Sequence, residues 1–128
     1  MEQHYASFEK IFRGERGEIK RRVAHYLDTL AAAGIQPGEN DIIIDLGSGR
    51  GEWLEVLAEH GFRGRGVDLN RGMLKESEAL GYEVVEADVL AYLKIQDNDS
   101  IAAVTSMHMV EHLPHAILIQ LLDESLRV

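Results

Sequence analysis

Apolar and polar positions follow two different patterns on either side of Pro37. Before it, apolar residues recur at the spacing of one helix face, and they are Ile19, Val23, Tyr26, Leu27 and Leu30. A shorter amphipathic stretch comes first, and Gly14 and Gly17 are expected to break it. Residues 1–38 are therefore predicted to form an N-terminal helical segment.

After Pro37, short apolar runs alternate with helical patterns. The runs predict strands over residues 41–46, 64–69, 83–86 and 101–106. Helical patterns follow each of them, and Pro114 is placed to open the last helix. Strands that alternate with helices indicate βαβ units, so residues 39–128 are predicted to form an α/β domain.

Composition and charge limit the possible partners, chemistry and location of the protein. The 128 residues are the size of one domain, and the formal net charge of -9 disfavours nucleic acid as a partner. The absence of cysteine excludes disulfides, thiolate zinc sites and a cysteine nucleophile. The first residues lack a signal-peptide pattern and no apolar run is long enough for a membrane span, so a cytoplasmic domain is expected.

The sequence IIIDLGSGRGEW places glycines at alternate positions directly after the first predicted strand. Gly47 and Gly49 permit backbone conformations and a close ligand approach that side chains would block. A dinucleotide fingerprint would need its third glycine at position 52, where Glu52 stands and would repel a pyrophosphate. A P-loop is excluded because no Gly-Lys-Ser/Thr follows. A tight turn without a ligand remains an alternative.

Acidic residues end the next two predicted strands. Asp68 stands where a carboxylate could accept both hydroxyls of a ribose, and the alternative role of helix cap could fall to Asn70 instead. Asp88 could accept from an adenine amine while Val89 offers its backbone N–H, or Asp88 could simply cap a helix. Together with Asp45, these residues suggest a site for an adenosine without a diphosphate.

Four segments resemble the class I S-adenosylmethionine-dependent methyltransferases: DLGSGRGEW, GVDLN, EADVLAYL and SMHMVEHLP, in the family's order. The resemblance implies a Rossmann-like parallel sheet with flanking helices, and S-adenosyl-L-methionine as cofactor. It also implies that Gly47, Gly49 and the neighbouring backbone hold the methionine part, that Asp68 binds the ribose and that Asp88 with Val89 binds the adenine. His108 would face the methionine or the substrate, and the further cofactor-binding candidates are Asp45, Ser48 and Leu69.

The segment FEKIFRGERGEIKRRVAHYL is similar to one found in bacterial methyltransferases linked to surface-polysaccharide biosynthesis. That similarity implies that Tyr5, Phe8 and Arg13 close the pocket, with Arg13 or Arg16 pairing the cofactor carboxylate. A plain amphipathic helix that covers the sheet is the alternative for the aromatic residues.

His108, Glu111 and His112 also match the pattern H-x-x-E-H of some zinc hydrolases. That chemistry needs both histidines on one face of a continuous helix, but here the motif directly follows a strand and Pro114 comes two residues later. The sequence therefore predicts no metal site.

The resulting hypothesis is a methyltransferase that works by direct in-line displacement on an unidentified small-molecule or saccharide acceptor, with a sugar hydroxyl as one candidate. His108, Glu111 and His112 are the candidate bases, although packing or loop capping would also explain Glu111 and His112. A non-catalytic S-adenosylmethionine-binding module is the rival, and Glu52 disfavours a nicotinamide-dependent dehydrogenase.

The family usually has seven strands, whereas this chain is expected to contain four, so the sheet is predicted to be truncated after the fourth. The fourth strand would then have an open edge. Homodimerisation through that edge is expected.

Overall fold

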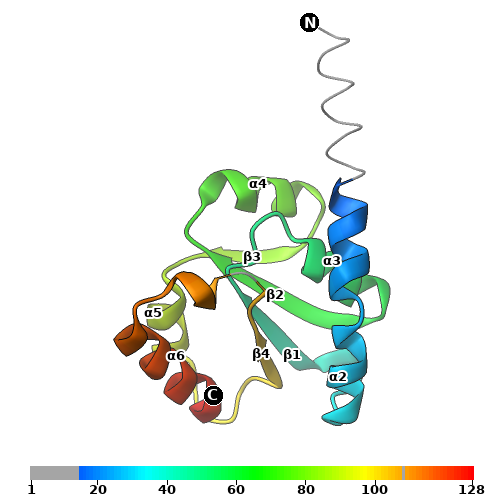
Figure 1. Cartoon of the computed structure of the whole chain (residues 1–128). Helices are drawn as coiled ribbons and strands as arrows, with labels where there is room; N and C mark the ends of the chain where they lie inside the picture. Colours follow the sequence, from blue (N-terminus) through cyan, green and yellow to red (C-terminus); the bar gives the residue numbers. More distant parts are fainter. Residues whose placement is uncertain (1–14, 108) are drawn as a thin grey trace, which may run out of the picture.

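A computed structural model describes residues 15–107 and 109–128. Residues 15–23 are helical, and the elements that follow alternate between helix and strand (Figure 1). In order, they are α2 (Tyr26–Ala32), β1 (Gly38–Leu46), α3 (Glu52–Glu59), β2 (Phe62–Asp68), α4 (Arg71–Ala79), β3 (Glu83–Glu86), α5 (Val89–Lys94), β4 (Ala103–Thr105), a 3-10 helix (Val110–His112) and α6 (His115–Arg127).

The four strands form one parallel sheet in the order β3-β2-β1-β4. The chain builds outward from β1 to β2 and β3, then crosses back so that β4 pairs with the other side of β1. The strand order therefore reverses between β1 and β4, which is where parallel α/β sheets bind ligands beyond their carboxyl ends. The Rossmann-like fold expected from the sequence is confirmed.

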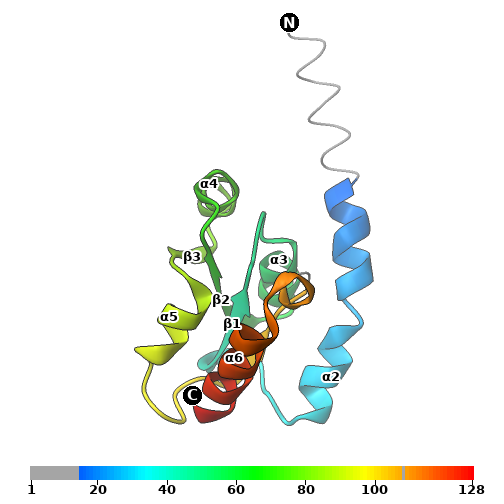
Figure 2. The same ribbon diagram turned by 60° about the vertical axis from the view of Figure 1, so that its left-hand side comes forward.

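Successive residues of β1 supply opposite faces of the sheet, and each face has its own core. Ile44 and Leu46 pack with residues of α5 and α6, including Leu93. Ile43 packs with α3 and with the helices that precede β1. Figure 2 shows the same arrangement, with α5 and α6 on one side of the sheet and α2 and α3 on the other. This alternation also fixes the direction of Asp45, which lies on the α3 side with Ile43.

The N-terminal helical region differs from the expectation in two ways. Gly17 does not break it, because residues 15–23 are helical throughout. A break occurs instead at residues 24–25, where the amides of Leu27 and Asp28 bond to carbonyls only three residues earlier. This tighter turn belongs to the 3-10 type, and on either side of it Val23 and Leu30 remain buried against the α3 face.

Strand and helix limits also differ from the sequence pattern. β4 covers only Ala103–Thr105 because its pairing with β1 is confined to three positions, whereas β1 extends back to Gly38 through a bulged pairing with Phe62. In α6, the apolar residues are only partly buried. Leu121 is in the core, but Leu126 is 87% exposed. Within the described residues, no helix is long and apolar enough to cross a membrane.

Gly66 of β2 lies where the glycine turn crosses the sheet, and we predict that Gly66→Ala destabilises the protein. A β-carbon there would overlap Oγ of Ser48 and lie 2.9 Å from Cδ1 of Leu54. The strain of this overpacking should lower the free energy of unfolding by about 1–3 kcal/mol, as measured by urea denaturation.

Gly72 of α4 provides the matched control. A β-carbon at Gly72 would meet only Oδ1 of Asn70, at an ordinary 3.5 Å. Gly72→Ala should therefore stabilise the protein by about 0.5–1 kcal/mol, since alanine is the better helix former. Equal effects of the two substitutions would contradict the proposed crowding at Gly66.

Candidate functional site

The turn after β1 is built from glycines in left-handed conformations. Gly47, Gly49 and Gly51 have φ angles of 73°, 56° and 84°. The amides of Gly47 and Ser48 both donate to the Val67 carbonyl, at 2.8 and 3.4 Å, so the turn is tied to β2. A β-carbon at Gly47 would also come within 2.9 Å of Met109. The backbone thus lies flat across the carboxyl end of the sheet and leads directly into α3.

Asp68, at the end of β2, holds this turn in place. Its Oδ2 accepts the amide of Gly49 at 2.9 Å, and its Oδ1 accepts the amide of Asn70 at 2.8 Å. Asn70 itself caps α4 by accepting the amide of Met73, as the sequence allowed. Because an ionised carboxylate has about four lone-pair sites, Asp68 can still accept two hydroxyl donors from a ligand.

An outer cleft of about 480 Å³ opens beside the turn. It brings together most of the predicted nucleoside-binding residues from the ends of β1, β2 and β3. Its lining comprises Gly47, Gly49, Asp68, Leu69, Met73, Ala87, Asp88, Val89, Met109, His112 and Leu113. The cleft is therefore largely apolar, with carboxylates at fixed positions on its wall.

Asp88 has the capping role that the sequence left open. Its Oδ2 accepts the amide of Ala91 at 2.9 Å in the first turn of α5. Capping uses one lone pair of one oxygen, so it is compatible with a second acceptor role toward the outer cleft.

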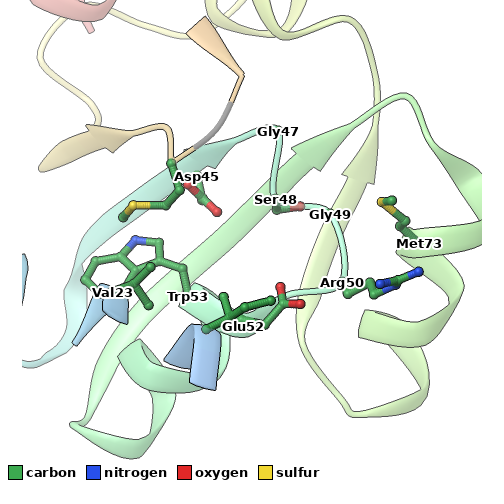
Figure 3. A pocket seen from close by; sticks show the side chains of 11 residues that line it. Val23, Asp45, Gly47, Ser48, Gly49, Arg50, Glu52, Trp53 and Met73 are labelled. Atoms are coloured by element: carbon green, nitrogen blue, oxygen red, sulfur yellow. The ribbon is translucent and has the colours of Figure 1, made fainter. Parts of the chain in front are cut away.

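An inner cavity of about 230 Å³ lies on the other side of the glycine turn, between the turn and the N-terminal helix (Figure 3). Gly47, Gly49 and Met73 line both spaces, so the turn is their shared wall. The other lining residues of the inner cavity are Ile19, Val23, Asp45, Ser48, Arg50, Glu52, Trp53 and Met107.

Asp45 is a buried carboxylate on the wall of this inner cavity. It is 2% exposed, and its Oδ1 accepts the Thr105 hydroxyl at 3.0 Å. The Thr105 oxygen in turn accepts the indole N–H of Trp53 at 3.1 Å. Burial, with smaller contributions from the charges of Asp68 and Glu52, raises the pKa of Asp45 to about 7.

Arg16 joins the N-terminal helix to the glycine turn. Its guanidinium donates to the carbonyls of Arg50 and Gly51 at 2.8 and 3.3 Å, and to the Glu55 carboxylate at 3.1 Å. The arginine thus satisfies two backbone carbonyls directly before α3. Its pairing with a cofactor carboxylate stays a prediction.

The predicted catalytic residues are only partly brought together. His112 lines the outer cleft, and its Nε2 is 3.5 Å from the exposed carboxylate of Glu111 on the 3-10 helix. Tyr5, Arg13 and His108 lie outside the described residues. Within residues 15–107 and 109–128, no three side chains are grouped so as to hold a metal ion.

Comparison with known proteins identifies the family. A family model described as a methyltransferase domain matches residues 15–127. The chain belongs to this family. The fold agrees, since a solved S-adenosylmethionine-dependent methyltransferase from Archaeoglobus fulgidus superimposes with a TM-score of 0.78 at 34% identity, covering 96% of this chain and 52% of the other.

Two further relatives are informative. A methyltransferase from Thiobacillus denitrificans, solved with S-adenosyl-L-homocysteine, gives a TM-score of 0.55 at 27% identity over 80% of this chain and 44% of its own. A ubiquinone biosynthesis O-methyltransferase of Cupriavidus pinatubonensis is 32% identical in an alignment of 80 positions that covers 56% of this chain and 31% of the relative. The methyltransferase domain thus spans about half of its solved relatives and about a third of the curated one.

Sequence reasoning missed several residues of the methyltransferase site. Trp53 bonds to Thr105, and Thr105 bonds to Asp45, only because α3 and β4 both lie beside β1. No local sequence pattern predicts these contacts. Met107 and Met109 could have been predicted, since both belong to the segment directly after the fourth strand.

We predict that Asp45→Asn stabilises the methyltransferase domain at neutral and higher pH. Because the folded-state pKa of Asp45 is raised, ionisation opposes folding, and the cost grows as pH rises from the unfolded value near 3.8 to about 7. A shift of this size corresponds to roughly 4 kcal/mol once the group is fully ionised. Urea denaturation between about pH 5 and about pH 8 should show the asparagine variant gaining on the wild type as pH rises.

Asp123→Asn is the matched control, because Asp123 is exposed on α6. Its difference from the wild type should change little over the same range. A pH-independent difference for Asp45→Asn would refute the buried, proton-binding carboxylate.

Proposed function

We propose that this domain binds S-adenosyl-L-methionine and supplies the donor side of a methyl-transfer reaction. The observation that carries the proposal is the glycine turn with a space on each side, an outer cleft with Asp68 and Asp88 and an inner cavity with Asp45. Relatives with 34% and 27% identity that are named as S-adenosylmethionine-dependent methyltransferases support the same cofactor.

The residues fit the parts of this cofactor. The adenosine would occupy the outer cleft, with Asp68 and Leu69 at the ribose and Asp88 and Val89 at the adenine. The methionine part would cross the turn toward Asp45, where Gly47, Ser48 and Gly49 leave room for it.

Charge favours the inner cavity for the cationic end of the cofactor. The negative charges of Asp68 and Glu52 both raise the pKa of Asp45. A sulfonium and an ammonium group in that space would offset this repulsion and lower the pKa of Asp45.

When bound, the cofactor supplies a methyl group on a positively charged sulfur, which is already a strong electrophile. The protein's task is positioning: the glycine turn and Asp68 fix the donor, and the walls of the inner cavity exclude water around it. The bound cofactor would supply the methyl group, and the acceptor's hydroxyl oxygen would receive it. The acceptor's proton passes to a base or to solvent.

The acceptor is a hydroxyl-bearing small molecule in this proposal. The sugar hydroxyl and the link to surface-polysaccharide biosynthesis rest on the N-terminal segment, much of which lies outside the described residues. The curated relative is named as an O-methyltransferase of ubiquinone biosynthesis, which also favours oxygen as the methylated atom. His112 is the candidate base within the described residues, and Glu111 would act through it.

A non-catalytic S-adenosylmethionine-binding module is the second candidate. It is favoured by one observation, that the side chains of the candidate bases Glu111 and His112 are mostly exposed. Turnover with an acceptor separates the two functions. The cytoplasmic location expected from the sequence stays a prediction.

Binding of the cofactor tests the proposal first. In calorimetric titration, S-adenosyl-L-homocysteine should bind the wild-type chain, while NAD should not. Asp68→Ala should weaken binding by about 10–100-fold, because it removes the carboxylate that would accept the ribose hydroxyls and that now holds the Gly49 amide.

Asp123→Ala, which removes an exposed carboxylate on α6, should bind as the wild type does. Circular dichroism confirms that each variant is folded. Equal affinities of the two alanine variants, or absence of binding by a folded wild type, would reject the site.

We also propose that the chain forms a homodimer through the outer edge of β4, which in the described residues pairs only with β1. Light scattering should give twice the mass of the chain, falling toward the monomer mass on dilution. A monomer at all concentrations would reject the dimer.

A further inference from the structure

A third space, here called the side pocket, lies next to the inner cavity. It has a volume of about 230 Å³ and is formed by α2, by the first turn of α3 and by the end of β4. Its lining residues are Tyr26, Thr29, Leu30, Trp53, Thr105, Ser106 and Met107. None of these side chains is charged, in contrast to the inner cavity with Asp45 and Glu52.

The side pocket and the inner cavity share a wall. Trp53 and Met107 line both of them, and Thr105 of the side pocket bonds directly to Asp45 of the inner cavity. A ligand in the side pocket would therefore stand beside a ligand in the inner cavity, separated only by an indole ring and a flexible thioether.

Aromatic and apolar surfaces dominate the side pocket. The rings of Tyr26 and Trp53 meet edge to face, with centroids 6.5 Å apart and planes at 83°. Leu30 and Met107 complete the apolar surface. Such a wall favours a flat ring, which can stack on one aromatic face and meet the edge of another.

The polar groups of the side pocket are the hydroxyls of Tyr26, Thr29, Thr105 and Ser106 and the indole N–H of Trp53. Thr105 is already occupied, since it accepts from Trp53 and donates to Asp45. Ser106 Oγ is buried without a hydrogen-bond partner among the described residues. A buried hydroxyl without a partner is costly, so a ligand group that bonds to Ser106 after a rotamer change would gain affinity there.

We propose that the side pocket is the acceptor subsite and that it binds an uncharged aromatic compound carrying a hydroxyl group. The inference rests on the proposed methyl-transfer function and deepens it. The volume suits one substituted ring, and the shared wall places the ring's hydroxyl next to the space assigned to the methyl donor. A sugar would bring several hydroxyls to a wall whose surface is mostly apolar, and each hydroxyl left without a partner there would carry a desolvation penalty.

The protein contains a single tryptophan, and it stands in the shared wall. The indole N–H resonance of Trp53 in a proton–nitrogen NMR spectrum is therefore a specific reporter for both spaces. The probes are p-cresol for the aromatic hydroxyl and methyl glucoside for the sugar, each titrated with and without saturating S-adenosyl-L-homocysteine. p-Cresol should shift the resonance saturably, and methyl glucoside should not.

Thr29→Phe tests the location, because Thr29 is exposed on α2 and lines the side pocket. The added ring should fill the space and weaken p-cresol binding about tenfold or more, with no change in affinity for S-adenosyl-L-homocysteine. Ala32→Phe is the matched control, since Ala32 is exposed on the same helix but does not line the pocket. This variant should bind p-cresol as the wild type does.

The outcomes separate the two proposals. Saturable p-cresol binding that Thr29→Phe alone abolishes supports the acceptor subsite. No p-cresol binding, equal binding of methyl glucoside, or equal effects of the two phenylalanine variants would overturn it while leaving cofactor binding intact. Failure of S-adenosyl-L-homocysteine to bind would instead reject the function on which the subsite rests.

Discussion

The hydrogen bond from the Gly49 amide to the Asp68 carboxylate is the contact on which the site depends. It joins the carboxyl ends of β1 and β2 at the level where a ligand would enter. With the Val67 carbonyl holding the amides of Gly47 and Ser48, it fixes a turn that left-handed glycines alone would leave free to move. The two spaces on either side of the turn are shaped by this one crossing.

The buried carboxylate of Asp45 opposes folding when it is ionised. Its pKa of about 7 reflects an environment that disfavours the negative charge, despite the Thr105 hydroxyl that bonds to it. Burying a neutral residue at this position would cost less free energy on folding. A cationic ligand would reverse this balance, because it stabilises the same charge that burial opposes.

The N-terminal helical region is part of the site and does more than cover the sheet. Arg16 donates to the carbonyls of the glycine turn, and Ile19 and Val23 close the inner cavity. Further along, Tyr26 and Leu30 form one wall of the side pocket. The inner cavity and the side pocket are therefore bounded by the same helical segment.

Local sequence was sufficient for the elements and for one half of the site. Buried parallel strands have a continuous apolar pattern, so the strand ends near which Asp45, Asp68 and Asp88 stand could be located without coordinates. Asn70 as the cap of α4 followed from residue type and position alone. These features depend on neighbours within a few residues.

Only the tertiary structure decided the rest. No local pattern indicates that Trp53 bonds to Thr105 and Thr105 to Asp45, since 52 and 60 positions separate the bonded pairs. The contacts of Arg16 with the glycine turn could not be predicted for the same reason, because its partners lie 34 and 35 residues away. Contacts of this kind depend on the chain crossing that places β4 beside β1. A local pattern of apolar and polar residues does not determine which strands become neighbours.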